Sequence, residues 1–208
     1  VLDTGRRGFQ VTNFLRYRGI KKIDAIVLSH GDSDHAGGLK DIIDRFDVLE
    51  IWDNGRLLYP DGFIKNKRLR SLNRGDMVNG DGYSILVLHP YKGFYAMNPK
   101  ESEENNDSLL LKIETNKTSF LFTGDIGIEA IDDLLYLNKY LKSSVLKVPH
   151  HGSRSSASEK FIETVSPDIA VISAGRRNIY GNPHEEVLQM LSSIKVFRTD
   201  RDGAVCIK

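Results

Sequence analysis

The sequence predicts an α/β fold in a single domain over residues 1–208. Apolar runs of strand length alternate with segments whose apolar residues recur at helical spacing. The composition, 40% hydrophobic and 27% charged residues, allows one full core to be buried. No internal repeat, low-complexity segment or linker divides the chain. These three observations favour one mixed domain.

The first quarter of the chain predicts a strand, a helix, a strand, a loop and a second helix. Val1–Gly5 is typical of a strand that ends in a turn at glycine. Apolar residues at helical spacing then stop before Gly19, and a second set of them follows Gly38. The expected elements are a helix over 9–18, a strand over 24–29, a helix around 39–46 and a short strand over 48–52.

The middle of the chain predicts hairpins. Turn residues and alternating apolar positions continue to residue 88, which favours antiparallel hairpins over further helix. Residues 91–107 form a polar loop that is long enough to border a site. Two further strands are expected over 109–113 and 119–123, joined by Asn116-Lys117.

The last third returns to alternating helices and strands. Asn182-Pro183 predicts a helix start with an asparagine cap and proline at the first position. The other expected elements are a helix over 128–141, a strand over 145–148, a helix over 157–165, a strand over 169–173 and short strands near Val196 and Val205.

Several functional classes find no support in the sequence. The single cysteine, Cys206, excludes a disulfide framework and a thiolate metal site. A net charge of +1 does not by itself indicate a nucleic-acid partner. No Gly-x-Ser-x-Gly or Walker motif occurs, and no run approaches a membrane span of about 18 apolar residues. The chain begins without methionine in an apparent strand, so we expect a piece of a longer protein.

Ser29–Gly38, directly after the apolar run 25–28, concentrates metal-ligand side chains. Imidazole and carboxylate are ligands of zinc, manganese and iron in hydrolases. Four such residues fall within six positions: His30, Asp32, Asp34 and His35. A polar turn, with Asp32 or Asp34 capping the next helix, is an adequate alternative for any one of them, but a weak one for the set.

Other predicted strands also end in ligand-type residues. They are Asp3, Asp125 and the pair His150-His151. Sites in mixed α/β domains commonly lie at strand ends, so we expect these residues to converge with the loop. Asp3 is expected to support a ligand or a turn rather than to bind metal itself.

With these residues, the sequence resembles the metallo-β-lactamase superfamily over nearly its whole length. The loop matches the signature His-x-His-x-Asp-His, except that Asp32 replaces the second histidine. The further motifs Asn-Asn-x-Ser-Leu, Thr-Gly-Asp and Pro-His-His-Gly-Ser are most similar to the hydrolase domain of the ComEC family of DNA-uptake competence proteins. The resemblance implies an αββα sandwich, with its N-terminal strands missing from this piece.

The resemblance also implies two divalent metal ions, manganese or zinc. One ion would be held by His30 and Asp32, and the other by Asp34, His35 and either His150 or His151. Asp125 would bridge them. The superfamily usually has another histidine before the bridging aspartate, where this chain has Asn105, Asn106 and Asp107. Oxygen donors in place of imidazole favour harder ions, which makes manganese a competitor to zinc.

Three residues are candidates for phosphate contact. Ser153 and Arg154 directly precede a predicted helix, where hydroxyls, a guanidinium and backbone amides suit an anion. His184 is a candidate to contact phosphate or to protonate the leaving group, and with Asp34 it is an expected catalytic residue. Serines that merely cap a helix, and a plain surface histidine at 184, are the open alternatives.

The implied function is metal-dependent hydrolysis of a phosphodiester, in which one strand of DNA is degraded during uptake. The implied partners are single-stranded DNA and a membrane channel in the parent protein, with this soluble domain outside the cytoplasm. An esterase of small phosphodiesters such as choline-phosphate groups, and a non-catalytic DNA-binding module, are the alternatives. The oligomeric state is left open.

Overall fold

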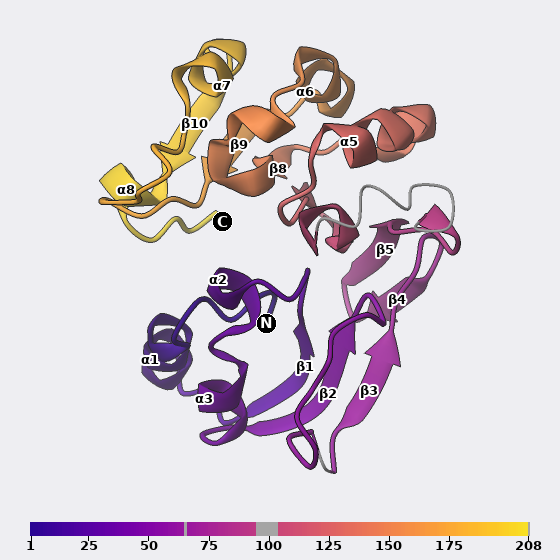
Figure 1. The fold of residues 1–208 in the computed structure, drawn as a ribbon, viewed down its shortest axis with the longest axis vertical. Helices are drawn as coiled ribbons and strands as arrows, with labels where there is room; N and C mark the ends of the chain where they lie inside the picture. The colour runs from indigo at the N-terminus through magenta and orange to yellow at the C-terminus, as the bar shows by residue number, and fades with distance from the viewer. Residues whose placement is uncertain (65, 95–103, 208) are drawn as a thin grey trace.

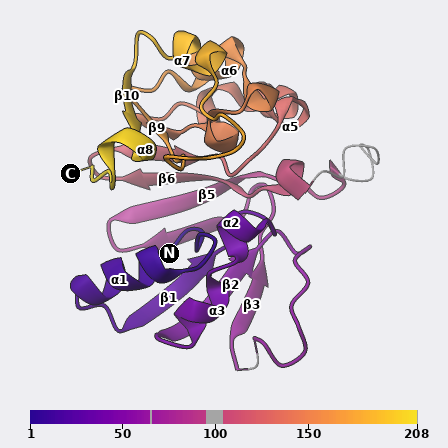
Figure 2. The same cartoon turned by 60° about the vertical axis from the view of Figure 1, so that its left-hand side comes forward.

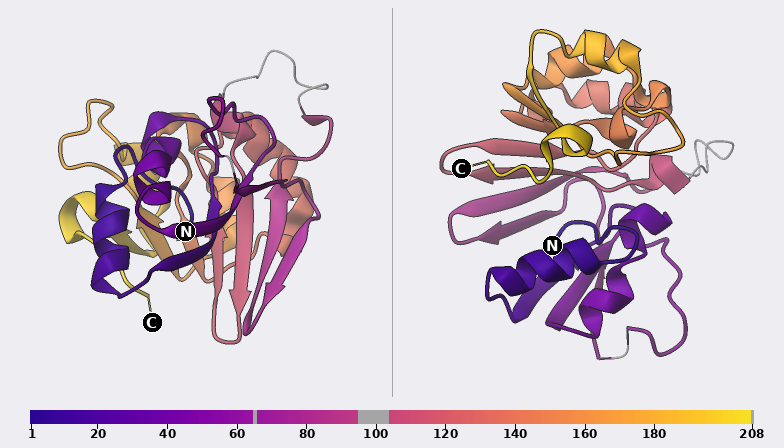
Figure 3. Two further views of the ribbon diagram at one scale, coloured as in Figure 1. Left: turned by 90° about the horizontal axis from the view of Figure 1, so that it is seen from below. Right: turned by 90° about the vertical axis from the view of Figure 1, so that its left-hand side faces the viewer.

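A computed structural model describes residues 1–64, 66–94 and 104–207, and it consists of two β-sheets packed face to face (Figures 1 and 2). Helices cover the outer face of each sheet (Figure 3). The layers are therefore helix, sheet, sheet and helix, which confirms the predicted αββα sandwich.

The smaller sheet has three parallel strands in the order β1-β2-β3. Its strands and helices are β1 (Lys22–Val27), β2 (Asp47–Asp53), β3 (Arg68–Ser71), α1 (Phe9–Tyr17), α2 (Ser33–Ala36) and α3 (Leu39–Ile43). Leu15 of α1 and Ile42 of α3 pack with Ile26 and Ile51 of the sheet. This apolar cluster fixes the helices over β1 and β2, and the loop rich in ligand residues follows the end of β1.

The larger sheet has seven strands in the order β10-β9-β8-β7-β6-β5-β4. Neighbours from β10 to β7 are parallel, and those from β7 to β4 are antiparallel. The strands are β4 (Met77–Gly80), β5 (Tyr83–His89), β6 (Leu110–Thr115), β7 (Ser119–Phe122), β8 (Val145–Lys147), β9 (Ile169–Ile172) and β10 (Lys195–Arg198).

Helices and turns of the second half cover the outer face of this sheet or connect its strands (Figure 1). They are η1 (Glu104–Asp107), α5 (Ile128–Leu134), η2 (Leu135–Tyr140), η3 (Pro149–Gly152), η4 (Arg154–Ser156), α6 (Glu159–Val165), α7 (Glu185–Met190) and α8 (Thr199–Asp202), where η denotes a 3-10 turn.

Strand β6 shows how the layers are held together. Leu110 faces the helices and packs with Ile131 and Phe161. Leu111 faces the other sheet and joins a cluster with Val27 and Trp52. Because successive strand residues point to opposite faces, an uninterrupted apolar run is what a strand covered on both sides requires.

The structure corrects several predicted elements. Strand β3 pairs parallel with β2 instead of forming a hairpin. The helix expected over 128–141 ends as α-helix at Leu134 and continues as the turn η2. No strand forms at Val205. The cap of α7 is His184, with Pro183 before the helix, so the predicted asparagine cap is wrong. In the predicted loop 91–107, residues 95–103 lie outside the described residues.

Within the described ranges, no helix has both the length and the hydrophobicity that a bilayer span demands.

Candidate metal centre

The ligand-rich loop leaves β1 at the end that faces the larger sheet. Its first ligand-type residue, His30, is fully buried, and α2 begins three residues later at Ser33. Asp32 holds the cap position of α2 through its backbone carbonyl, which accepts from the amides of His35 and Ala36. Its carboxylate makes no cap hydrogen bond. A side-chain helix cap therefore does not account for Asp32.

His35 is oriented by Asp3. Asp3 Oδ2 accepts from His35 Nδ1 at 2.8 Å, and the same carboxylate accepts from the amide and hydroxyl of Ser29 at 2.7 and 2.9 Å. With its proton on Nδ1, His35 presents Nε2 to the centre. This is the supporting role predicted for Asp3. The pairing keeps Asp3 ionised: burial opposes it, but the contacts with His35 and Ser29 hold the pKa of Asp3 below its usual value.

Asp125 reaches the centre from the turn after β7. Gly124 in this turn has a φ of 54°, and a Cβ at this position would lie 2.5 Å from Ser108 Cβ, so only glycine fits. The Ser108 hydroxyl accepts from the Asp125 amide at 2.9 Å and lies 3.2 Å from His30 Nδ1. Ser108 thus ties the turn to the first histidine.

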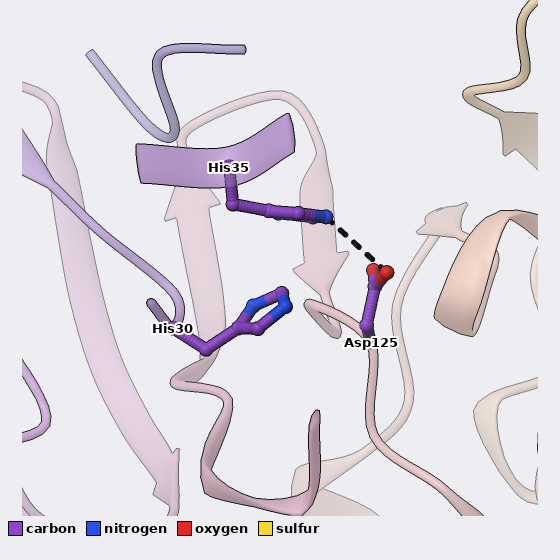
Figure 4. A group of neighbouring side chains, drawn as sticks. All are labelled: His30, His35 and Asp125. Atoms are coloured by element: carbon purple, nitrogen blue, oxygen red, sulfur yellow. Dashed lines mark ion pairs between the residues drawn. The ribbon is translucent and has the colours of Figure 1, made fainter. Parts of the chain in front are cut away.

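The two oxygens of the Asp125 carboxylate have different partners. Oδ2 lies 3.2 Å from His35 Nε2 and 3.0 Å from His151 Nε2, whereas Oδ1 lies 3.0 Å from Lys147 Nζ. Figure 4 shows His35 and Asp125 pointing toward each other, with His30 beside them. Burial opposes ionisation of Asp125, but Lys147 and the histidines outweigh it and hold its pKa far below the usual range.

Of the paired histidines, only His151 joins the cluster. His150, His151 and Gly152 all have left-handed backbone conformations, with φ values of 46°, 55° and 81°, which are costly for the two histidines and turn the chain sharply after β8. His151 Nδ1 donates to the Ser173 carbonyl at 2.6 Å, so Nε2 faces Asp34 Oδ2 at 3.4 Å. His150 Nδ1 lies beside the Ser155 hydroxyl at 3.2 Å.

Among the described residues, two groups of three ligand atoms lie within 4.8 Å of one another. They are His30, His35 and Asp125, and Asp34, His35 and His151. Metal–ligand distances near 2.1 Å place two ligands of one ion roughly 3.0–3.5 Å apart, which matches the spacing around Asp125 Oδ2. Five of the predicted ligands therefore converge from three segments of the chain.

A buried nitrogen without a partner supports a cation here. His30 Nε2 is buried and has no hydrogen-bond partner in the part of the chain that the structure describes. Burial, together with nearby His35, lowers the pKa of His30, so the ring is neutral and able to bind metal. A divalent ion satisfies such a nitrogen, and the set of imidazole and carboxylate donors suits manganese or zinc.

Protons balance the carboxylates of the metal-free cluster. Burial opposes charge on His35, but the hydrogen bonds to Asp125 and Asp3 raise its pKa to about 9. The hydrogen bond from His151 lowers the pKa of Asp34 to about 2. For His151, burial is again opposed by Asp125 and Asp34, and the pKa is raised. The cluster thus holds positive charge where a metal ion would replace protons.

Asp32 lies beside His30 at the edge of the cluster, and Asn105 and Asn106 occupy the region where the superfamily usually has another histidine. Asp32 Oδ2 lies 3.6 Å from His30 Nε2, and its side chain is 42% exposed. The Asn106 side chain is engaged by the Gly127 amide and Glu129. Asn105 Oδ1 is buried and finds no hydrogen-bond partner within the described ranges.

The three candidates for phosphate contact lie around the turn after His151. Ser153 Oγ accepts from the Ser155 amide as an ordinary cap of η4. Arg154 Nε pairs with Glu186 at 3.1 Å on the surface. His184 Nδ1 accepts from the Arg154 amide at 3.3 Å. None of the three lines either cavity that borders Asp34 and His151, so their phosphate role stays a prediction.

Two residues of the centre, Lys147 and Ser108, are not predicted from the sequence. Lys147 donates to Asp125 Oδ1 and to the Gly124 carbonyl at 2.7 Å. A signal for it does exist, because it is the only charged residue within the apolar run 145–148. Ser108 is the serine of the motif Asn-Asn-x-Ser-Leu, but the motif by itself gives no role for it at the centre.

Comparisons with known proteins show the family to which the chain is similar. Residues 1–176 match the family model described as Metallo-beta-lactamase superfamily. ComE operon protein 3 of Bacillus subtilis is 35% identical over 92% of this chain and 25% of its own length. Competence protein ComA of Neisseria gonorrhoeae is 33% identical over 99% of this chain and 28% of its own length. The chain thus spans about a quarter of these relatives.

A solved structure shares the fold. Tm1679, described as a metal-dependent hydrolase of the beta-lactamase superfamily, superposes with a TM-score of 0.57 at 17% sequence identity. The match covers 94% of this chain and 84% of that protein.

Proposed function

Since the chain belongs to the metallo-beta-lactamase superfamily, we propose that it is a metal-dependent phosphodiester hydrolase that degrades one strand of DNA during DNA uptake. The observation that carries the proposal is the buried group of His30, His35 and Asp125 beside Asp34 and His151. The names of the competence relatives support DNA uptake as the setting.

At this centre, some residues of the chain would bind the ions and others orient the histidines. Three imidazoles and two carboxylates would hold the ions, and Asp32 would add an oxygen at the side of His30. Divalent ions bound there supply Lewis acidity and make water a nucleophile at neutral pH. Asp3 and the Ser173 carbonyl fix the proton positions of His35 and His151, so that both Nε2 atoms face inward.

Two ions, manganese or zinc, are proposed because the ligand atoms form two overlapping groups, one with His30 and Asp125 and the other with Asp34 and His151. His35 Nε2 has a single lone pair and would bind only one of the two ions. Asp125 Oδ2 contacts both His35 and His151, which suits a bridging carboxylate. The Lys147 ammonium beside Oδ1 turns the other oxygen inward. Asp32 and Asp34 make the set richer in oxygen than a site of histidines alone, which favours manganese as well as zinc.

The phosphate-contact residues are proposed to act at the edge of this centre. His184 Nδ1 accepts a hydrogen bond from the Arg154 amide. Nε2 is therefore the nitrogen that would donate a proton to the leaving group. Ser153 and Arg154 would contact phosphate oxygens. This assignment is tested by His184→Gln, which should lower kcat roughly 100-fold, the usual contribution of a general acid.

The parent protein is proposed to be membrane-bound, with this domain outside the cytoplasm and single-stranded DNA as its partner beside a membrane channel. The relatives named for competence are about four times longer than their match to this chain. The remaining three quarters of such a protein offer room for a channel. Protease accessibility of the domain in intact cells with a permeabilised wall would test the side of the membrane.

The decisive experiment is cleavage of a labelled single-stranded oligonucleotide with Mn²⁺ or Zn²⁺ added. The protein should cleave it, and Asp34→Asn should reduce the rate by at least about 100-fold. Asp132→Asn, a change at an exposed aspartate on α5, is the matched control and should have no effect.

A protein that binds both metals yet never cleaves DNA would refute the nuclease. Turnover of a chromogenic phosphodiester without DNA cleavage would point to an esterase of small substrates. Oligonucleotide binding that Asp34→Asn leaves unchanged, with no activity on either substrate, would identify a non-catalytic binding module.

A further inference from the structure

A hollow of about 610 Å³ adjoins the metal centre. Asp34 and His151 form part of its wall, the loop over residues 173–182 forms another part, and Arg6 also lines it. We propose that this hollow binds one unpaired nucleotide beside the scissile phosphate, with its base stacked on Tyr180 and its phosphates held by Arg6 and Arg177. This proposal rests on the proposed function and states where the DNA strand would lie beside the metal centre.

The loop 173–182 is built by its own hydrogen bonds. Asn178 Nδ2 donates to the carbonyls of Gly175 and Asn182 at 2.9 and 2.7 Å, and Asn178 Oδ1 accepts from the Asn182 amide at 2.8 Å. The Thr199 hydroxyl pairs with both the amide and the carbonyl of Ala174. The loop therefore has a defined shape before any ligand arrives.

The side chains at the tip of the loop remain exposed despite this order. Ile179 is 89% exposed and Tyr180 is 69% exposed. Neither is needed to hold the loop, because Asn178 satisfies its backbone. A fixed apolar and aromatic pair on a polar rim next to a catalytic centre is typical of a binding surface.

The charges in the hollow suit a phosphate backbone. Arg6 and Arg177 are exposed and form no ion pair within residues 1–64, 66–94 and 104–207. Arg6 is held in place because its carbonyl lies against Gly37, where a Cβ would approach it to 2.6 Å. The loop carrying Arg6 thus packs closely against the ligand-rich loop, and Arg6 lines the hollow together with Asp34 and His151.

An unpaired base fits this surface better than duplex DNA does. An aromatic platform contacts the face of a base, and in a duplex both faces are already stacked on neighbours. Stacking tolerates every base, which suits an enzyme that degrades a strand of any sequence. The hollow is also within the range of about 300–1,000 Å³ that holds small-ligand groups.

The test compares Tyr180→Ala with Tyr180→Phe, which keeps the ring. Tyr136→Ala is the matched control, because Tyr136 is 89% exposed on η2 and lines none of the hollows beside the centre. With Mn²⁺, Tyr180→Ala should raise KM for a single-stranded oligonucleotide at least about fivefold, the effect expected for one stacked base. Tyr180→Phe and Tyr136→Ala should stay near the original protein, and hydrolysis of a chromogenic phosphodiester without a base should be unchanged.

A second variant tests the arginines. Arg6→Gln with Arg177→Gln should flatten the dependence of log affinity on log salt by about 0.7 for each phosphate that an arginine no longer neutralises. A merely structural effect of the substitutions would not change this slope. Duplex DNA of the same length should bind more weakly than the single strand to the original protein.

The failure of this inference can be told apart from failure of the nuclease. If DNA is cleaved but Tyr180→Ala leaves KM unchanged and the arginine substitutions leave the salt slope unchanged, the hollow is not the nucleotide site. If no DNA is cleaved, fluorescence anisotropy with the same labelled oligonucleotide compares the variants directly. Equal binding by Tyr180→Ala and the original protein would then overturn the proposal.

Discussion

At the scale of single residues, the centre depends on side chains that hold other side chains. Asp3 fixes His35, Ser173 fixes His151, and Ser108 links His30 to the Asp125 turn. Such supporting contacts set which imidazole nitrogen carries the proton. The geometry of the centre therefore rests on residues that would never touch a metal ion.

Asp3→Asn tests this dependence. The amide cannot offer His35 Nδ1 and the Ser29 hydroxyl a charged acceptor, so His35 should lose its fixed orientation. We expect Mn²⁺ affinity to fall roughly 10- to 100-fold, measured by calorimetry. Asp132→Asn is again the control, and equal affinities for the two variants would show that Asp3 does not orient the ligand.

His89 gives the protein a pH dependence that is separate from the metal centre. Its ring is fully buried, with Nε2 donating to the Asn106 carbonyl at 2.8 Å. Burial lowers the pKa of His89 to about 4. Because the unfolded chain takes up this proton near pH 6.5 and the folded protein only near pH 4, stability is lost as the pH falls through that window.

The expected loss of folding stability is about 3 kcal/mol, since each unit by which the pKa is shifted is worth about 1.4 kcal/mol. Urea denaturation in the presence of a chelator at pH 7 and pH 4.5 measures most of it. His89→Gln can keep the hydrogen bond without titrating, so its stability should fall less over the same range. Parallel pH profiles for the two proteins would contradict the assignment.

The choice between His150 and His151 marks the limit of sequence reasoning at this scale. The motif places two histidines at the end of β8, but three consecutive left-handed residues decide which one faces the centre. Nothing in residue types or spacing encodes that turn. For the same reason, the pairing of Arg154 with Glu186 could not be predicted, because the two residues are brought together only by the docking of α7.

At the scale of elements, the sequence predicts well which segments with strong apolar patterns form strands. It predicts less well which strands pair with each other. Leu110 and Leu111 fill two different cores, and this is visible in the sequence as an unbroken apolar run. The parallel pairing of β3 with β2 depends on where the chain returns after residue 53, which periodicity does not report. Val205 sits in a terminal segment without ladder partners among the described residues, so its apolar neighbours do not make a strand.

The contact between the loop at Gly8 and the start of α3 fixes the metal-binding loop as a unit. A Cβ on Gly38 would lie 2.3 Å from the Gly8 amide nitrogen and 2.5 Å from the Thr4 carbonyl oxygen. Backbone atoms cannot move aside cheaply, so Gly38→Ala should destabilise the protein by about 2–3 kcal/mol. The free energy of unfolding from urea titration measures this.

Gly175→Ala is the matched control for that substitution. Its Cβ would meet only the Asn178 side chain, at 4.0 Å, and its φ lies outside the left-handed region. We expect a change within about 0.5 kcal/mol. A similar small change for Gly38→Ala would mean that the two loops are not in contact.

At the scale of the whole molecule, the centre joins the two sheets. Asp3, His30 and His35 belong to the side of β1, whereas Asp125 and His151 follow β7 and β8 of the larger sheet. A metal ion bound by both sets links the halves of the sandwich. Its binding free energy should therefore appear as stability of the entire fold.

Addition of Mn²⁺ at about 100 times its Kd should stabilise the protein by about 2.7 kcal/mol and raise Tm by roughly 5–10 °C. A chelator should reverse the shift. Differential scanning calorimetry should show one transition that moves as a whole, and movement of only part of the transition would mean that the ion does not couple the two sheets. Mg²⁺ at the same concentration is the control for ionic strength.

The order of these segments along the chain has a consequence for biosynthesis. Asp3, His30 and His35 emerge from the ribosome first, Asp125 follows some ninety residues after His35, and His151 comes later still, with Ser173 to orient it. Between the synthesis of His35 and that of His151, a nascent chain therefore carries only part of the ligand set. The complete ligand set forms only when both halves of the sandwich are in place.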